Sequence, residues 1–275
     1  PEQKRQFVKA LKAQGKTVGM TGDGVNDVLA LKEANCSIAM ASGSEAASQV
    51  SQLVLVDSDF SKMPSVVGEG RRVVNNIERT ASLFLVKNIF SLLLSLFSMI
   101  AVNGYPMEPS QVSLVAMFTI GIPAFFLSLE PNKSLIKGRF LTNVFTKAAP
   151  AGITDFLVVS ALVVFCSMFN IDEESVSTAC TVLISVVGFM ILYRISKPMN
   201  WRHWLLIIAM IAGWIGCVIF LRPLFGITAM SVQCIMLLAV FALVADPVLR
   251  FFSLIVDKSF WRSKIDKVLG IVHRR

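Results

Sequence analysis

The chain has 275 residues, 55% of them hydrophobic, and a mean hydropathy of +0.68, which excludes an ordinary soluble domain as the whole structure. The hydrophobic residues form long runs from about position 80 to 256, whereas residues 1 to about 65 have a soluble composition. The formal net charge of +8 could suggest nucleic acid, but the basic residues of the apolar part lie in the breaks between its runs. We therefore expect no nucleic-acid partner, and a small soluble piece joined to a membrane piece.

The first 61 residues alternate helix and strand patterns. In chain order the sequence predicts a helix at 2–14, a strand at 16–21, a helix from 28 to about 35, a strand at 37–40, a helix capped by Ser44 and a strand at 53–56. This order of elements is half of a doubly wound α/β domain, so residues 1–61 are expected to form a partial domain of that class.

The first predicted strand runs into an acidic loop, Gly22-Asp23-Gly24-Val25-Asn26-Asp27. Ligands of α/β folds bind where strands end, and two carboxylates in a turn that Gly22 and Gly24 make tight suit Mg²⁺ and a phosphoryl group. We expect Asp23 to bind the metal because it leaves the strand first, with Asp27 supporting it from the start of the helix. Asn26 and nearby backbone N–H groups are placed to hold phosphate oxygens.

One continuous helix is expected from Lys62 to Val102, since no strong break interrupts it. Such a helix would be about 60 Å long, whereas the hydrocarbon core of a bilayer is about 30 Å thick. Only residues 81–102 are apolar enough to lie in that core, so residues 62–80 are predicted to form a stalk in water. The helix would then connect the α/β piece directly to the bilayer.

The apolar region 81–256 is predicted to hold six spans, at about 81–102, 111–129, 148–169, 175–193, 203–221 and 229–250. Loops 130–147 and 194–202 and the tail 257–275 are basic, and the loops of the other side are mainly acidic. By the positive-inside rule the α/β piece, the basic loops and both termini are cytosolic. Membrane lipid is thus an expected partner, including anionic lipid at the basic tail.

Polar residues inside the spans are candidates for a transport site. Lys87, Asn88 and Ser91 lie in the apolar part of the stalk helix. An ionisable residue within a membrane is a functional hypothesis, although Lys87 is near enough to the cytosolic end to extend its ammonium to the interface instead.

The next two spans add two more features. Thr119 is followed by Gly121 and Pro123, a pattern that predicts a broken helix whose carbonyl groups bind a cation, with a plain packing kink as the alternative. Asp155 is expected about two turns into the following span, either as a functional acid or as the partner of a basic loop residue.

Residues 1–102 resemble the carboxyl-terminal part of the phosphorylation domain and the fifth transmembrane helix of a P-type ATPase. The motifs that carry the resemblance are Pro1-x-x-Lys4, Met20–Asp27 followed by Ala30-Leu31-Lys32, Ile38-Ala39-Met40, Val54-Leu55-x-Asp57, and Gly70-Arg71 with Asn75-Asn76. The resemblance implies a partial haloacid-dehalogenase-like α/β domain followed by an all-α polytopic bundle of six transmembrane helices. It also implies that Lys4 neutralises phosphoryl charge, that Asp23 binds Mg²⁺, and that Asn26 and Asp27 complete the site.

The same resemblance implies a bacterial cation pump of the plasma membrane, with transmembrane helices five to ten present in this chain. Six spans exclude the heavy-metal class, which has two after this domain. The glycine and proline after Thr119 resemble the sixth helix of cation pumps, and Lys87 aligns with a lysine that acts as a built-in countercation in gastric proton pumps. Ser91 and Ile120 stand where such pumps carry carboxylates. ATP and Mg²⁺ are the implied cofactors, and calcium is the first candidate for the transported ion.

Several parts of such a pump are absent from this sequence. It contains no Asp-Lys-Thr-Gly-Thr motif with the family's nucleophile, and it begins at Pro1 and not at Met. We therefore expect a piece of a longer protein that neither forms a phosphoenzyme nor hydrolyses ATP alone, with the remainder of the pump as its partner. The alternatives are a P-type ATPase that moves a polyamine, a lipid or a peptide, and a non-catalytic half that regulates or completes another pump.

Overall fold

The structure, a computed structural model, describes residues 1–101, 104–257, 264, 265 and 268. The chain divides into two compact units, residues 1–69 and residues 70–275. Each unit is described by itself.

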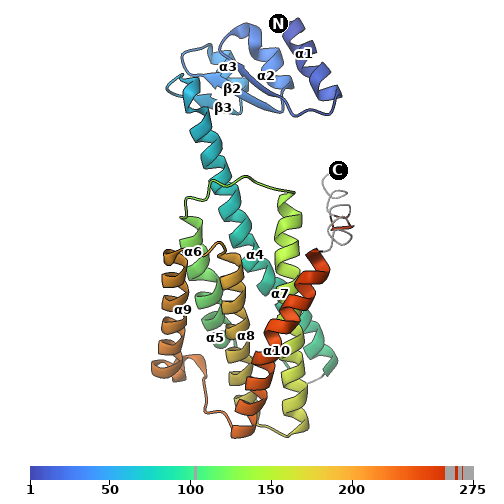
Figure 1. Cartoon of the computed structure of the whole chain (residues 1–275), viewed down its shortest axis with the longest axis vertical. Coiled ribbons are helices and arrows are strands. Elements are labelled where there is room, and N and C mark those ends of the chain that lie inside the picture. The colour runs from blue at the N-terminus through green and yellow to red at the C-terminus, as the bar shows by residue number, and fades with distance from the viewer. Residues whose placement is uncertain (102–103, 258–263, 266–267, 269–275) are drawn as a thin grey trace. The chain divides into compact units, whose positions relative to one another are not determined.

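The first unit is a three-stranded parallel sheet with short helices (Figure 1). The strands are β1 Gly19–Gly22, β2 Cys36–Met40 and β3 Leu53–Leu55, and the helices are α1 Glu2–Ala13, α2 Val28–Glu33 and α3 Glu45–Val50, with 3₁₀ turns at Val25–Asp27 and Phe60–Lys62. The order of the strands is β1-β2-β3, so each chain crossover leads to the neighbouring strand. The prediction of a partial α/β domain is confirmed.

The core of this unit is small. Leu31 of α2, Ala39 of β2 and Ala47 of α3 are buried together. As predicted, Ser44 caps α3: its hydroxyl oxygen accepts a hydrogen bond from the backbone N–H of Ala47 at 3.2 Å. Strand β1 begins three residues later than predicted. The backbone N–H of Val18 donates a hydrogen bond to the side-chain oxygen of Asn35 at 3.0 Å, where a strand residue would bond to the neighbouring strand.

The second unit contains six helical segments that are long and apolar enough to cross a membrane (Figure 1). They are α4 Met63–Ala101, the run of α5 Pro109–Ala116, a π-helical segment Met117–Gly121 and α6 Ile122–Ser128, then α7 Phe140–Met168, α8 Glu173–Ile195, α9 Trp201–Phe220 and α10 Val232–Asp257. The prediction of six long apolar helices is confirmed. The stalk 62–80 and the tail 257–275 stay predictions, and most of the tail lies outside the described residues.

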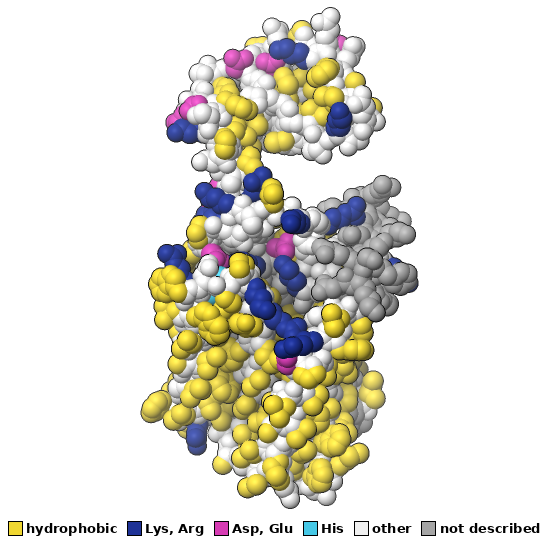
Figure 2. Space-filling view, in the orientation of Figure 1, with side chains coloured by type: hydrophobic (Ala, Val, Ile, Leu, Met, Phe, Trp, Pro, Cys, Tyr) yellow, Lys and Arg dark blue, Asp and Glu magenta, His cyan; other side chains and the backbone are white. Residues whose placement is uncertain are grey.

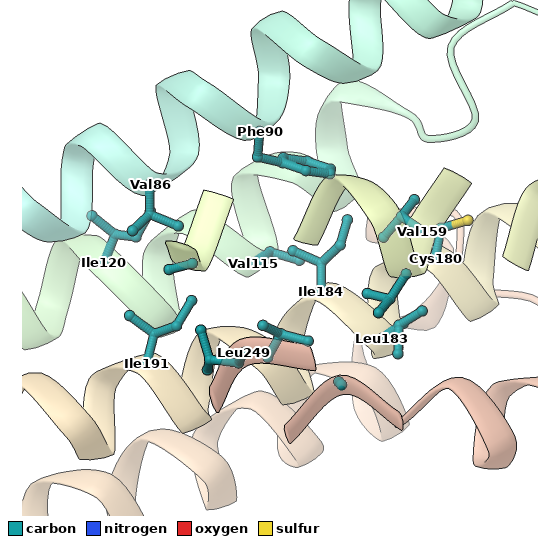
Figure 3. Close-up of a cluster of buried hydrophobic side chains, with 14 of the residues drawn as sticks. Val86, Phe90, Val115, Ile120, Val159, Cys180, Leu183, Ile184, Ile191 and Leu249 are labelled. Atoms are coloured by element: carbon teal, nitrogen blue, oxygen red, sulfur yellow. The ribbon is translucent and has the colours of Figure 1, made fainter. Parts of the chain in front are cut away.

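Helices α7, α8 and α10 pack together in the middle of this unit. Leu162, Leu183 and Leu249 bury nearly their whole side chains in one cluster. Figure 3 shows that the cluster extends to Val86 of α4, which lies close to Ile120 of the π-helical segment. Because lipid tails are as apolar as leucine, such packing stabilises the bundle mainly through close van der Waals contact.

Two glycines make this close contact possible. A Cβ atom on Gly152 of α7 would lie 2.8 Å from Ile89 of α4, and a Cβ atom on Gly188 of α8 would lie 2.7 Å from Thr119. The absence of side chains at these two positions lets α7 approach α4 and lets α8 approach the π-helical segment.

Helix α7 differs from its predicted span in where it starts. It begins at Phe140, eight residues before the predicted position 148. Polar side chains in this first part are buried within the unit, Thr142 and Asn143 among them, so helix continues where hydropathy alone predicts a loop. As a result Asp155 lies about four turns into its helix, and not two.

We expect Gly152→Val to lower the melting temperature of the chain in detergent micelles. The new side chain would overlap Ile89 and the backbone oxygen of Val86, and overpacking of this kind costs about 1–3 kcal/mol. Gly216→Ala in α9 is the matched control, because nothing lies within 4 Å of the added Cβ and alanine favours helix. An equal loss of thermal stability in both variants would contradict the close approach of α7 and α4.

Candidate functional site

The acidic loop joins β1 to α2 and is closed by an ion pair. Lys4 of α1 donates a hydrogen bond from Nζ to Oδ1 of Asp27 at 2.6 Å. The other carboxylate oxygen of Asp27 accepts the backbone N–H of Gly24 at 3.4 Å. The fold thus brings together two predicted site residues that are 23 positions apart in the sequence.

The ion pair sets the charge of Asp27. The hydrogen bond from Lys4 holds the pKa of the Asp27 carboxyl below its usual value of 3.8, against the opposing effect of burial. Asp27 is 6% exposed, whereas the Lys4 side chain is largely open to solvent. At neutral pH the loop therefore carries an ionised, positioned carboxylate with an ammonium group beside it.

Two glycines keep the loop compact. A Cβ atom on Gly22 would lie 2.6 Å from the Cβ of Asp27, so only glycine fits at this predicted position. A Cβ atom on Gly43 would overlap the backbone of Asp23, whose carbonyl oxygen also accepts the N–H of Ser44 at 2.6 Å. The sequence analysis did not predict a role for Gly43 at the loop, although its position just after β2, Cys36–Met40, was the available signal.

The remaining predicted residues of the loop point their polar groups to solvent. Asp23 and Asn26 are exposed, and their side chains make no hydrogen bond or ion pair within the part of the chain that the structure describes. The Asp23 carboxylate is thus free to bind a hard cation. Mg²⁺ is usually bound by one or two carboxylates together with water and phosphate oxygens, so a single exposed carboxylate fits this ion. No cluster of three or more His, Cys, Asp or Glu suited to a metal occurs among the described residues.

A second candidate site is a buried cavity of about 50 Å³ in the second unit. Four of the predicted transport residues line it: Lys87 and Ser91 of α4, Thr119 of the π-helical segment and Asp155 of α7. The other lining residues are mostly apolar, such as Phe90 and Ile184. A cavity of this size holds one or a few water molecules or a largely dehydrated cation.

Asp155 is the most constrained group of the cavity. It is 3% exposed, and its Oδ1 atom has no hydrogen-bond partner within the described residues. Lys87 is half-buried and lines the same cavity, but no direct ion pair joins the two side chains. An unpartnered buried carboxylate is costly, so Asp155 requires a proton, a water molecule or a cation in the cavity.

Three predicted residues lie elsewhere. Asn88 is exposed and Gly121 is also exposed, while Pro123 is buried without lining the cavity. The sequence predicts a broken helix here, but the helix continues through the wider π-helical turns of Met117–Gly121. Proline has no N–H, so the carbonyl of Thr119 loses its α-helical donor and the backbone adapts by widening, a feature common at functional sites.

Sequence reasoning missed a polar cluster that ties α4 to the loop after α6. Arg79 of α4 pairs with Glu130, whose other oxygen lies 3.0 Å from Nε2 of His203 in α9. Beside it, Lys147 of α7 pairs with Glu78 of α4 at 2.6 Å. Opposite charges near the predicted ends of different spans were the available signal.

The fold defines the class of the protein: a multi-pass membrane protein in which a small parallel α/β unit precedes six helices long and apolar enough to cross a membrane in the described part of the chain. No family model matches the chain. The calcium-transporting ATPase CtpE of Mycobacterium bovis is 42% identical over 240 residues, which cover 82% of this chain and 30% of that protein. The probable cation-transporting ATPase exp7 of Streptococcus pneumoniae is 36% identical over 258 residues, which cover 89% of this chain and 33% of that protein.

A calcium-transporting ATPase of Bacillus subtilis is 32% identical over 198 residues, or 68% of this chain and 22% of that protein. The chain belongs to the bacterial cation-transporting P-type ATPases and spans about a third of the length of the relatives that it matches most extensively. The predicted resemblance to this family is confirmed.

We expect Lys4→Met to raise the pKa of Asp27, because the main stabiliser of the carboxylate is removed and burial remains. A group with a depressed pKa stabilises the fold above its unfolded pKa, and this stabilisation is lost as the pH falls below about 4. Carbon-detected NMR titration of the Asp27 carboxyl measures the change, with Lys16→Met as the control because Lys16 is exposed and away from Asp27. The same Asp27 titration curve in Lys4→Met and in the unchanged chain would contradict the ion pair.

Proposed function

We propose that this chain is a segment of an ATP-driven cation pump that supplies the charge-stabilising half of its phosphorylation site and part of its ion path. The observation that carries the proposal is the cavity lined by both Lys87 and Asp155. Ionisable side chains within a membrane bundle are expensive and mark ion pathways, and here a lysine from α4 and an acid from α7 line one small cavity.

In the α/β unit, the proposal assigns Asp23 as the residue that holds Mg²⁺ and Asn26 as a contact for phosphoryl oxygens. When bound, Mg²⁺ neutralises charge on the phosphoryl group. Lys4 is held at the loop by Asp27 and supplies a further positive charge. The proposal gives these loop residues the tasks of positioning and electrostatic stabilisation. It assigns ATP binding and the nucleophile to a part of the pump outside this chain.

Calcium is the first candidate for the transported ion because relatives carry that description in their names. Ca²⁺ takes six to eight oxygen ligands, and the described cavity offers the carboxylate of Asp155, two hydroxyl groups and a repelling ammonium. A calcium site therefore needs further oxygen ligands from elsewhere in the pump. Lys87 acts in this proposal as an internal cation that balances Asp155 when no ion is bound.

The proposal places the chain in the plasma membrane as a multi-pass protein, with the α/β unit and the C-terminus in the cytosol. Support comes from the basic residues that follow α6 and α8 and from those in the last part of α10, including Lys133, Lys197 and Arg250. A pump for a polyamine, lipid or peptide and a non-catalytic half-pump are the competing functions.

The test is ATP hydrolysis by the full-length pump that contains this segment, measured with Ca²⁺, Mn²⁺, Na⁺ and K⁺ and with a polyamine such as spermidine. We expect Ca²⁺ to give the largest stimulation. Stimulation by another ion but not by Ca²⁺ would refute the calcium assignment and leave the cation pump standing. Stimulation by spermidine alone would favour the polyamine pump, and no hydrolysis under any condition would favour the half-pump.

Lys87→Ala in the same assay tests the cavity. Removing an ammonium from a small, mostly apolar cavity should tighten the apparent affinity for the cation by about tenfold or allow hydrolysis without it. The neighbouring Asn88→Ala is the matched control, because Asn88 is exposed and does not line the cavity. Unchanged ion dependence in Lys87→Ala would instead support a lysine that only reaches the interface.

A further inference from the structure

A groove of about 720 Å³ lies between α8, α9 and α10, apart from the ion cavity. Its walls are largely apolar side chains of all three helices: Phe189, Met190, Ile207, Ile211 and Leu254. At the end of the groove where α8 terminates, the lining changes to Arg194, Lys197 and Arg250. The groove is therefore amphipathic along the helix direction, with an apolar body and a basic end.

The basic end has an excess of positive charge. Asp246 accepts hydrogen bonds from Nη2 of Arg194 at 3.1 Å and from Nε of Arg250 at 2.6 Å. One carboxylate thus balances one of the two arginines, and Lys197 adds a further cation. The terminal amino groups of Arg250 make no hydrogen bond to any other described residue, and its side chain is 71% exposed.

Aromatic residues fix the position of this end. The ammonium of Lys197 lies 5.1 Å from the centre of the Tyr193 ring, which holds the lysine at the groove. The Tyr193 ring is in turn 5.9 Å from the ring of Trp204 on α9. Tyrosine and tryptophan favour the headgroup level of a bilayer, so this end of the groove lies where lipid phosphates are found.

We propose that this groove binds an anionic phospholipid, with its phosphate at Arg194, Lys197 and Arg250 and an acyl chain along the apolar walls. Charge decides between the lipid classes: an anionic headgroup offsets the excess positive charge, whereas a zwitterionic headgroup brings its own cation to a basic rim. A free phosphate ion would leave the apolar walls without a partner. The site is independent of the ion cavity and of the proposed pump function.

The surroundings also favour an anionic occupant. A second, more polar cavity of about 760 Å³ shares Arg194, Lys197 and Ser253 with the groove, and it adds Lys133, whereas its other lysine, Lys147, is paired with Glu78. Figure 2 shows a band across the second unit in which Lys and Arg side chains predominate over Asp and Glu, above a surface of mainly hydrophobic side chains. A headgroup at the end of the groove would meet this band of positive charge.

The experiment is native mass spectrometry of the whole chain in detergent micelles, titrated with phosphatidylglycerol or with phosphatidylcholine of the same acyl chains. We expect phosphatidylglycerol to bind at least tenfold more tightly. In Lys197→Gln/Arg250→Gln, the affinity for phosphatidylglycerol should fall about thirtyfold, since each lost charge weakens binding to an anionic lipid by about a factor of five. Both substitutions leave Asp246 paired with Arg194.

Two further variants complete the test. Arg202→Gln/Arg222→Gln removes the same charge outside the groove and should change the affinity less than twofold. Ile211→Trp fills the apolar part without changing the charge and should abolish lipid retention. Equal retention of the two lipids, or equal weakening by the two double variants, would overturn the proposal; weakening only in variants whose melting temperature also falls would assign the residues to folding instead.

Discussion

The burial of one carboxylate, that of Asp155, is the constraint on which the membrane unit depends. Its Oδ1 atom has no protein partner within the described residues, and the side chain lies about four turns into α7. A carboxylate at such depth is stable only with a proton, water or a cation beside it. The cavity that Asp155 shares with Lys87 supplies the space for that partner.

The packing around Asp155 creates this cavity. Gly152 brings α7 against α4, and Gly188 brings α8 against Thr119, so that helices carrying polar groups come close without filling the space between them. The π-helical turns of Met117–Gly121 change which residues face inward, and they place Thr119 at the cavity. Two glycines, Gly152 and Gly188, and the π-helical turns of Met117–Gly121 thus create a polar site within an otherwise apolar bundle.

Much of this arrangement can be predicted from the sequence. The periodicity of hydrophobic residues predicts the three strands and the six long helices, and Ser44 at the start of α3 behaves as its residue type indicates. The family motifs predict that Lys4 and Asp27 belong to one site, but their ion pair is seen only in the fold, where α1 meets the acidic loop.

Other features depend on packing that no local pattern contains. Lys87 and Asn88 are neighbours that the sequence offers equally as candidates for a transport site, but of these two only Lys87 lines the cavity. The early start of α7 follows from polar residues that are buried by other helices, which a hydropathy scale interprets as a loop. The Arg79–Glu130–His203 cluster joins three segments far apart in sequence, so no local pattern predicts that its members meet.

The central claim is that Asp155 is the ion-responsive group of the cavity. Infrared difference spectroscopy of the full-length pump that contains this segment, recorded in lipid as Ca²⁺ or another cation is added, tests it most directly. The account predicts a change in a carboxyl or carboxylate band that disappears in Asp155→Asn and persists in Asp246→Asn. A difference spectrum that is the same with and without the Asp155 carboxyl would contradict it.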